Sequence, residues 1–319
     1  MTFTVVRYEP SRHEALWDRW CSAAANVNAT FLHTRRFLGY HKDRFDDRSV
    51  LLYQSDRLSA VVPAAVSMLA RDVVDSHPGA TYGGVVHAGD LGGARMIEAM
   101  DALKRHYGEQ GFKTLLYKPM PWHFASMPSG DDVYALFRHD ARRIGCNLAC
   151  VVDLLSPGPR SERRRRGLRK ALRTATVVED MALLGEVWDI IVENLARKHD
   201  ARPVHSLDEV AELAALFPES IKLRAARVEG RLEAGVVLFN TPRVWRAQYI
   251  GSSDVGYSIS ALDAVFDDAI AAAGSAGARY FDFGTSNAEA GRVLNDGLFR
   301  FKAEFGGGGV VHEIYALSL

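Results

Sequence analysis

The chain has few cysteines, and their spacing is not that of a disulfide framework or a zinc site. Its 319 residues include three, Cys21, Cys146 and Cys150. None belongs to a CxxC pair, and none has a histidine cluster nearby at zinc-ligand spacing. We therefore expect reduced thiols in the interiors of helices or strands.

Long hydrophobic runs are also missing. The best apolar stretch, residues 58–70, is interrupted by Pro63 and is far shorter than the ~20 residues that span a bilayer. The N-terminus has no basic start followed by an apolar run, so no signal peptide is expected. Together these two absences predict a cytoplasmic protein with no membrane span.

The net charge is formally zero, with 39 Lys+Arg against 39 Asp+Glu. This balance argues against a surface wholly devoted to nucleic acid or anionic membrane, although it allows a local patch. A composition of 48% hydrophobic and 24% charged residues is that of an ordinary globular protein. The length fits one large domain or two medium ones, and either can bury a real core.

Hydrophobic periodicity predicts the same order of elements twice. The first half is predicted to contain strand 3–7, helices 14–24 and 35–41, strands 49–54, 58–67 and 81–86, helix 93–109, strand 114–117, helix 131–143 and strand 148–154. The second is predicted to contain helices 181–199 and 207–216, strands 221–228, 231–240 and 244–250, helix 260–273, strand 279–283, helix 291–305 and strand 310–317. This matched order predicts a structural duplication, with domains 1–155 and 156–319 and a basic helical segment, 160–173, at their junction.

The repeated order of two helices, three antiparallel strands, a helix, a strand, a helix and a strand resembles the GNAT acyltransferase fold. A tandem pair resembles the Fem family of peptidyl and aminoacyl transferases and the related acyltransferases of bacterial envelope polysaccharide biosynthesis. Most of the resemblance lies in residues 280–286 (YFDFGTS) and 298–306 (LFRFKAEFG), with further similarity in residues 31–40, 77–84 and 117–121 and in the arginine run. The expected fold is therefore α/β (α+β), with two tandem GNAT-like domains, each a mixed, mostly antiparallel sheet flanked by helices. The resemblance also implies that the first domain forms the acceptor side and the second the donor and catalytic side.

Lys302 and Asp282 are the candidate catalytic residues. Lys302 can be a helical lysine whose stem packs on the core. The resemblance implies instead that it faces the active cleft, where a cation stabilises the oxyanion formed when an amine attacks an ester or thioester carbonyl. Asp282, which alternates with two phenylalanines, is either bonded to backbone or arginine or acts as the general base for the acceptor ammonium. Glu304 and His312 are weaker alternatives.

Residues 251–260 join a strand to a long helix, and a loop of small residues before a helix can offer N–H groups to phosphate. The donor-binding candidates in this loop are Gly251, Ser252, Gly256, Ser258 and Ser260. Ser258 and Ser260 can instead cap the helix. The R/Q-x-x-G-x-G/A pattern that holds coenzyme A in an ordinary GNAT domain is absent. Both acyl-CoA, such as acetyl-CoA, and aminoacyl-tRNA therefore remain open as donors.

Segment 160–173 holds eight cations and one carboxylate. It is either a solvated helix face or a set of phosphate contacts, because guanidinium groups bind phosphate oxygens bidentately. No aromatic residues interleave with the arginines, which weakens a single-stranded RNA stacking role.

The acceptor-binding candidates rest mainly on the resemblance. They are Lys118, Tyr82, Arg36, Tyr40, Trp122, His205, Arg163 and Arg166. Lys118 ends a strand and precedes a proline-stiffened extended stretch, with Tyr82 expected on a neighbouring strand. Lys118 can also reach from a loop into water, Tyr40 fits a core position equally well, and His205 fits a structural role.

The first functional hypothesis is an N-acyltransferase that moves an acyl group from acyl-CoA to an amino group of a sugar or sugar-like acceptor. Direct attack needs no metal and no tightly bound cofactor, and the lack of a GxSxG motif argues against a covalent acyl-enzyme. The alternative is an aminoacyl-tRNA-dependent Fem-type transferase that adds an amino acid to a cell-wall precursor or small natural product. A third hypothesis is a non-catalytic module that binds phosphorylated glycan or nucleic acid through segment 160–173. The oligomeric state is left open.

Overall fold

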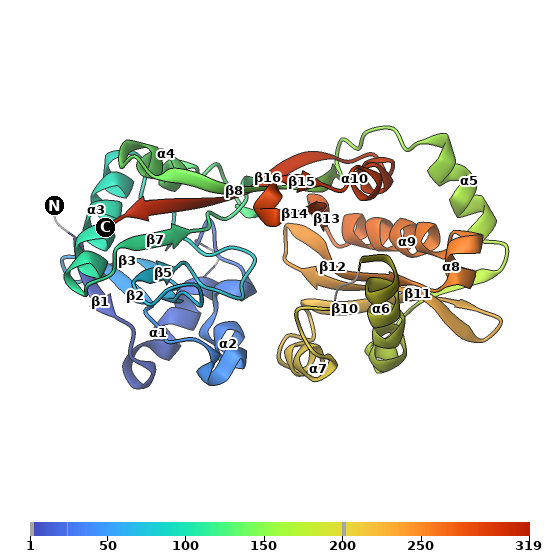
Figure 1. The fold of residues 1–319 in the computed structure, drawn as a ribbon, viewed down its shortest axis with the longest axis horizontal. Coiled ribbons are helices and arrows are strands. Elements are labelled where there is room, and N and C mark those ends of the chain that lie inside the picture. The colour runs from blue at the N-terminus through green and yellow to red at the C-terminus, as the bar shows by residue number, and fades with distance from the viewer. Residues whose placement is uncertain (1–2, 24, 200–201) are drawn as a thin grey trace. The chain divides into compact units, whose positions relative to one another are not determined.

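A computed structural model describes residues 3–23, 25–199 and 202–319. The chain has an α/β fold (Figure 1) that divides into two compact units. Unit 1 comprises residues 1–147, 287–293 and 311–319, and unit 2 comprises residues 148–286 and 294–310. No helix in the described part of the chain is both long and apolar enough to cross a membrane.

Unit 1 holds the first half of the elements. They are β1 (Phe3–Arg7), α1 (Pro10–Ser22), α2 (Arg35–Leu38), β2 (Val50–Gln54), β3 (Arg57–Val62), β4 (Ala65–Val66), β5 (Val73–Asp75), β6 (Val86–His87), α3 (Ala94–Glu109), β7 (Thr114–Tyr117), α4 (Asp131–Arg138) and the start of β8 (Arg142–Asp153). Short 3₁₀ turns lie at Phe31–His33, Gly39–Arg44 and Trp122–Phe124. The strands form two sets, β1-β2-β3-β6 and β4-β5-β7-β16, where β16 (Gly308–Ser318) is the last strand of the chain.

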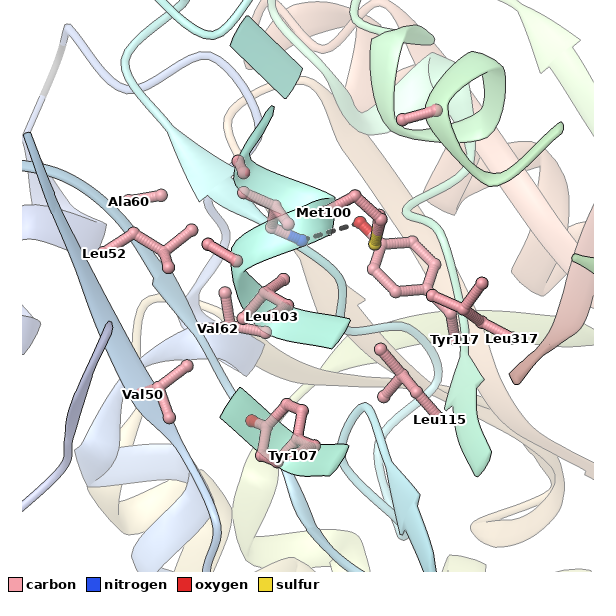
Figure 2. Close-up of a cluster of buried hydrophobic side chains, with 14 of the residues drawn as sticks. Val50, Leu52, Ala60, Val62, Met100, Leu103, Tyr107, Leu115, Tyr117 and Leu317 are labelled. Atoms are coloured by element: carbon pink, nitrogen blue, oxygen red, sulfur yellow. Dashed lines mark hydrogen bonds between the residues drawn. The ribbon is translucent and has the colours of Figure 1, made fainter. Parts of the chain in front are cut away.

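Helix α3 provides much of the core of unit 1. Its residues Met100, Leu103 and Tyr107 are buried together with side chains of β2, β3 and β7 (Figure 2). On β2 the core side chains are Val50 and Leu52, two residues apart, as expected when alternate strand positions share one face. The two-residue period therefore fixes which face of this sheet packs on α3.

Unit 2 holds the second set of elements. They are α5 (Glu162–Ala171), β9 (Ala175–Glu179), α6 (Leu184–His199), α7 (Leu207–Leu216), β10 (Ile221–Val228), β11 (Arg231–Asn240), β12 (Val244–Ser252), α8 (Asp254–Ile259), α9 (Ala261–Ser275), β13 (Tyr280–Thr285) and α10 (Asp296–Ala303), followed by β16 (Gly308–Ser318). The strand order is β8-β13-β12-β11-β10-β9. Phe266 of α9 packs against Phe281 and Phe283 of β13 and against Phe305.

The last strand of each half completes the sheet of the other unit. Residues 315–318 of β16 pair antiparallel with β7 in unit 1. Residues 149–153 of β8 pair antiparallel with β13 in unit 2. The predicted domains 1–155 and 156–319 divide the chain once, whereas each compact unit also includes the last strand of the other half of the sequence.

Several predicted elements of the first half are wrong in extent. The predicted strand 58–67 is broken into β3 and β4 around Pro63, which has no N–H to donate to a ladder. Of the predicted strand 81–86, only Val86 is in a strand, β6. The predicted helix 131–143 ends at Arg138, and Asp140 follows with a φ of 55° in the left-handed region.

In the second half, the predicted helix 291–305 is shorter in the structure and is confined to α10. The predicted loop 251–260 is mostly strand and helix. Strand β12 runs to Ser252, and helix α8 occupies Asp254–Ile259. Strand β9 was not predicted. Its burial pattern alternates only weakly, so its pairing with β10 was needed to define it.

Candidate active site

Lys302 of α10 is a buried lysine held by backbone carbonyl groups. Only 3% of the residue is exposed, and its Nζ donates hydrogen bonds to the carbonyl oxygens of Gly284 at 3.0 Å and Thr285 at 2.7 Å. Burial lowers the pKa of Lys302 to about 8, an effect opposed by Asp282 and reinforced by Arg246. The side chain is therefore still mostly an ammonium at neutral pH. An ammonium has three N–H donors, so two carbonyl partners leave one for a further acceptor.

Asp282 of β13 lies beside this lysine site and is fully buried. Its Oδ1 accepts a hydrogen bond from the Gly284 N–H at 2.6 Å, and its Oδ2 lies 3.4 Å from Nη1 of Arg246. Of the two roles expected for Asp282, the bonds to backbone and arginine are seen directly. The general-base role stays a prediction.

Strands β12 and β13 are paired for only three residues, Val244–Arg246 with Tyr280–Asp282. Beyond this point β12 continues along β11 to Ser252, without further pairing to β13. Asp282 is the last paired residue, so the Gly284 turn and Lys302 lie where the two parallel strands separate.

A cavity of about 520 Å³ lies in unit 2 between α5 and the α8–α9 segment. It is lined by Arg163, Arg164, Arg166, Gly167, Lys170, Ser252, Gly256, Tyr257, Ser260, Leu262, Asp263 and Phe301. We call it the arginine cavity. Its volume is in the range of small-ligand sites. Three of the five predicted donor residues line this cavity, together with Arg163 and Arg166, which were expected on the acceptor side.

The cations of α5 fall into groups with different partners. Arg164 is buried and paired with Asp263 at 2.5 Å and Glu304 at 3.1 Å. Arg165 and Arg169 pair with Glu162 on the exposed face. In the described part of the chain, the exposed guanidinium groups of Arg163 and Arg166 form no hydrogen bond or ion pair. The charge run therefore has three parts. Arg164 forms buried ion pairs, Arg165 and Arg169 lie on a solvated face, and Arg163 and Arg166 line the arginine cavity.

The predicted helix caps of the donor segment need correction. Ser260 occupies the position before α9, but its side chain makes no capping bond, and the Ser258 hydroxyl donates to the carbonyl of Val255. Ser253 is the capping side chain, accepting from the Gly256 N–H at 3.0 Å at the start of α8.

The two glycines of the donor segment meet packing constraints. A Cβ at Gly251 would lie 2.9 Å from the Ile191 backbone, and one at Gly256 would lie 2.2 Å from the carbonyl oxygen of Glu233. Neither position accommodates a larger residue without a shift of backbone. Close packing of β12 on α6 and of α8 on β11 is therefore sufficient to explain both glycines.

In unit 1, two predicted acceptor residues are internal. Tyr82 is 1% exposed, packs against His33 and Phe124, and shares a hydrogen bond of 3.1 Å with Thr30. It lies in a non-regular segment, not on the predicted neighbouring strand. Tyr40 is buried against Phe37.

The other predicted acceptor residues of unit 1 reach the surface to different degrees. Lys118 follows β7, and its Nζ lies 3.2 Å from Asp75 and 3.3 Å from the carbonyl oxygen of His77. Arg36 is exposed, and Trp122 is 60% exposed at the start of a 3₁₀ turn that replaces the predicted extended stretch.

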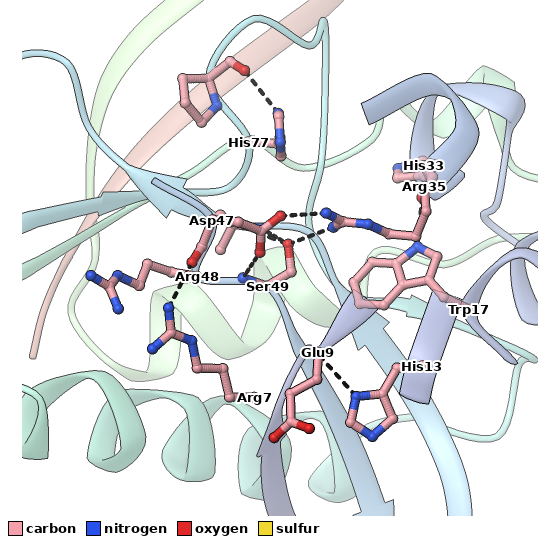
Figure 3. A network of polar contacts seen from close by, with 12 residues as sticks. Arg7, Glu9, His13, Trp17, His33, Arg35, Asp47, Arg48, Ser49 and His77 are labelled. Atoms are coloured by element: carbon pink, nitrogen blue, oxygen red, sulfur yellow. Dashed lines mark hydrogen bonds and ion pairs between the residues drawn. The ribbon is translucent and has the colours of Figure 1, made fainter. Parts of the chain in front are cut away.

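The neighbour of Arg36 has a structural role. Arg35 of α2 bonds to Asp47 and, at 3.0 Å, to the Ser49 hydroxyl, which ties α2 to the segment before β2 (Figure 3). The two adjacent arginines therefore differ. Arg35 bonds to Asp47 and Ser49, whereas Arg36 is exposed to solvent.

His205 is the remaining predicted acceptor residue, and it belongs to unit 2. It is buried, and its backbone N–H and Nδ1 both contact the hydroxyl of Tyr249. The adjacent Ser206 caps α7 in a capping box with Glu209, as expected for a helix start. These contacts agree with the structural role that the sequence offered for His205.

Arg246 and Ser253 were missed by the sequence reasoning. Arg246 interrupts the apolar positions of β12 as the only cation between Val244 and Ser252, which is the signal that could have singled it out. Its partner Asp282 is 36 residues away, so no local pattern could have paired them.

Residues 160–302 match the family model described as an acetyltransferase (GNAT) domain. This segment is therefore similar in sequence to a GNAT domain. The sequence matches no curated protein significantly. The matched residues include both Lys302 and all the residues that line the arginine cavity.

Solved structures extend the likeness to the whole fold. The crystal structure of FemX is 12% identical with a TM-score of 0.69, over 99% of this chain and 97% of that one. A tandem GNAT protein from the clavulanic acid biosynthesis pathway is 9% identical with a TM-score of 0.56, over 99% and 98%. The C-terminal domain of a putative lysylphosphatidylglycerol synthetase from Agrobacterium fabrum is 13% identical with a TM-score of 0.58, over 88% and 84%. The expected tandem GNAT fold is confirmed.

Proposed function

We propose that the protein is an N-acyltransferase whose reaction centre is at Lys302 and whose donor phosphates bind in the arginine cavity. The observation that carries this proposal is the buried ammonium of Lys302, placed by two carbonyl groups where β12 and β13 separate in a GNAT domain. A cation fixed in a site of low dielectric stabilises a developing oxyanion far better than one in water.

The chemistry is direct acyl transfer. The acceptor amine attacks the thioester carbonyl, the tetrahedral intermediate carries its negative charge near the free N–H of Lys302, and the C–S bond breaks to release the thiol. The amine loses one proton to a base, for which the sequence offers Asp282, and the thiolate gains one. No covalent enzyme intermediate is formed.

The donor class we favour is acyl-CoA, and the acceptor class is an amino group of a sugar or sugar-like molecule. Arg163 and Arg166 line the cavity and are exposed, so their guanidinium groups can bind phosphate oxygens, as a phosphate-bearing donor requires. The acceptor class follows the sequence resemblance to envelope polysaccharide acyltransferases. Use of acyl-CoA would place the reaction in the cytoplasm.

The test is a screen of acyl-CoA thioesters by thermal shift, followed by a transfer assay with amino sugars. We expect at least one acyl-CoA to raise the melting temperature, because a ligand that binds only the native state stabilises it. The Lys302→Met variant should bind the same donor but transfer acyl groups roughly 10²–10³-fold more slowly.

Three outcomes would contradict the proposal in different ways. Transfer that ribonuclease abolishes would favour aminoacyl-tRNA as donor. Full activity in a folded Lys302→Met variant would remove Lys302 from the reaction. Binding of phosphorylated glycan with no transfer under any condition would favour a non-catalytic module.

A further inference from the structure

Three buried charged side chains meet around one turn of unit 2. Arg246 on β12 and Asp282 on β13 are register partners across the short parallel ladder, and Lys302 approaches from α10. Arg246 is 9% exposed, Asp282 0% and Lys302 3%. With all three ionised, the group carries two positive charges and one negative charge.

Asp282 hydrogen-bonds to the backbone turn whose carbonyl groups bind Lys302. Its Oδ1 accepts the N–H of Gly284, two residues ahead, which is the bond of an Asx turn. Gly284 has a φ of 75°, in the left-handed region that favours glycine. The carbonyl groups that follow, of Gly284 and Thr285, are the two that accept from Lys302. The carboxylate therefore helps to set the direction of the lysine's acceptors.

Arg246 supports the same turn from the neighbouring strand. Its Nη1 is 3.4 Å from Asp282 Oδ2. Its Nη2 would lie 3.7 Å from a Cβ added at Gly284, so the guanidinium packs against the turn. In the part of the chain that the structure describes, the buried Nε of Arg246 has no hydrogen-bond partner. Burying a second cation is costly, and a well-packed apolar residue would be the cheaper choice for stability alone.

We propose that Arg246 and Asp282 are a positioning pair that fixes the Gly284 turn and so holds the ammonium of Lys302 in place for the reaction. This inference rests on the proposed function. It gives Asp282 a different part from that of general base, because Oδ1 accepts the Gly284 N–H and Oδ2 faces Arg246. The surplus positive charge favours the arrival of an anionic group, such as the oxyanion, at Lys302.

The first test follows the charge of Lys302 without relying on activity. The chain has eight lysines, so ¹³C labelling at lysine Cε gives a small set of titrating NMR signals, and Lys302→Arg identifies the one that belongs to Lys302. Cys150, on β8, is the other titratable group whose charge acts on Lys302. We expect the Lys302 signal to titrate near pH 8, to shift to higher pH in Arg246→Met and to lower pH in Asp282→Asn.

Arg224→Met is the matched control. Arg224 is an equally buried strand arginine of the same unit, paired with Glu179 and Asp268, and its loss should leave the Lys302 titration unchanged. An unaltered titration in both Arg246→Met and Asp282→Asn would overturn the proposal, whether or not the protein transfers acyl groups.

The second test separates positioning from proton transfer. Asp282→Ala removes the acceptor of the Gly284 N–H, so that amide should exchange with solvent faster than in Asp282→Asn, which keeps an acceptor oxygen.

In the transfer assay, Arg246→Met should lower kcat with little change in donor KM, and Arg246→Lys should recover part of the loss. If Asp282 is the base instead, Asp282→Asn removes the acidic limb of the pH–rate profile while Arg246→Met keeps kcat within a few-fold. That pattern would refute the positioning role. A native near-ultraviolet circular dichroism spectrum confirms that each variant is folded.

Discussion

Each unit has one partly or fully buried lysine near the strand that follows its long helix, and the two lysines have different surroundings. Lys118 of unit 1 lies 3.2 Å from the carboxylate of Asp75. Lys302 of unit 2 donates to two carbonyl groups and shares its site with Arg246 as well as Asp282. A lysine paired with one carboxylate is neutralised locally. A lysine held by neutral carbonyls beside an extra cation keeps its charge for a further partner.

The strand-to-helix junctions also differ. In unit 1 the loop before α3 ends at Gly93, which has no side-chain cap. In unit 2 a short helix, α8, is inserted before α9 and is capped by Ser253. The inserted helix contributes to the arginine cavity. The two units thus share a similar element order but differ at this junction. Unit 1 has a loop before α3, and unit 2 has the inserted helix α8 and the arginine cavity.

The largest expected effect separates the two lysines. Lys302→Met should lower kcat by roughly 10²–10³-fold, the usual effect of removing one oxyanion donor. Lys118→Met should change kcat only a few-fold and act on acceptor KM or stability, because it breaks a pair with Asp75. Steady-state kinetics on both variants test this difference. An equal loss of kcat would mean that the two sites act together in the chemical step.

The second effect is a pH dependence in the core of unit 1. Burial raises the pKa of Asp132 to about 6, although Tyr117 donates a hydrogen bond to it. Since the pKa is higher in the folded state than the unfolded value of about 3.9, this stabilising contribution is full below about pH 4. It is lost as pH rises through about 6, and its full size is about 2–3 kcal/mol.

Amide exchange of β7, corrected for its intrinsic pH dependence, measures this change, and Asp132→Asn should remove it. Tyr117→Phe is the control, since it keeps the carboxyl group and should retain a pH dependence. If the wild-type protection of β7 is constant from pH 4 to 7, Asp132 does not titrate in this range.

The third effect concerns the two groups of cations on α5. The double variant Arg163→Ala with Arg166→Ala should raise donor KM roughly 10- to 100-fold, since hydrogen bonds to charged groups contribute about 1.5–3 kcal/mol and exposure weakens them. Arg165→Ala with Arg169→Ala removes the same charge from the face paired with Glu162 and serves as the matched control. Equal changes in KM would mean that only the overall charge of the helix matters.

The smallest effect tests the cap of the inserted helix. Ser253→Ala should cost about 1 kcal/mol of stability, as loss of a capping side chain usually does. Ser258→Ala should stay within about 0.5 kcal/mol, because Ser258 is exposed and bonds only within its own turn. Urea unfolding followed by tryptophan fluorescence measures both variants. A larger loss for Ser258→Ala would restore it as the cap.

Much of the fold could be read from the sequence because the longer elements have strong hydrophobic periods. Helix α3 and strands β10 and β11 have the predicted bounds within one residue. Short strands such as β5 could not be found, because three residues carry no period and depend on pairing with β4 and β7. Lys302 and Asp282 came from the family resemblance, and the structure places them in one buried charge group. Their catalytic roles stay predictions.

The sequence by itself determined the two similar sets of elements, the tandem GNAT fold and the concentration of positive charge in segment 160–173. The element order and the charge follow from periodicity and composition, which are local along the chain, and the GNAT fold follows from the family resemblance. Only the tertiary structure decided which arginines of that segment pair with carboxylates, that Arg246 meets Asp282, and that each half completes its sheet with the last strand of the other. These outcomes depend on contacts between residues tens to hundreds of positions apart, where burial and charge pairing select the partners.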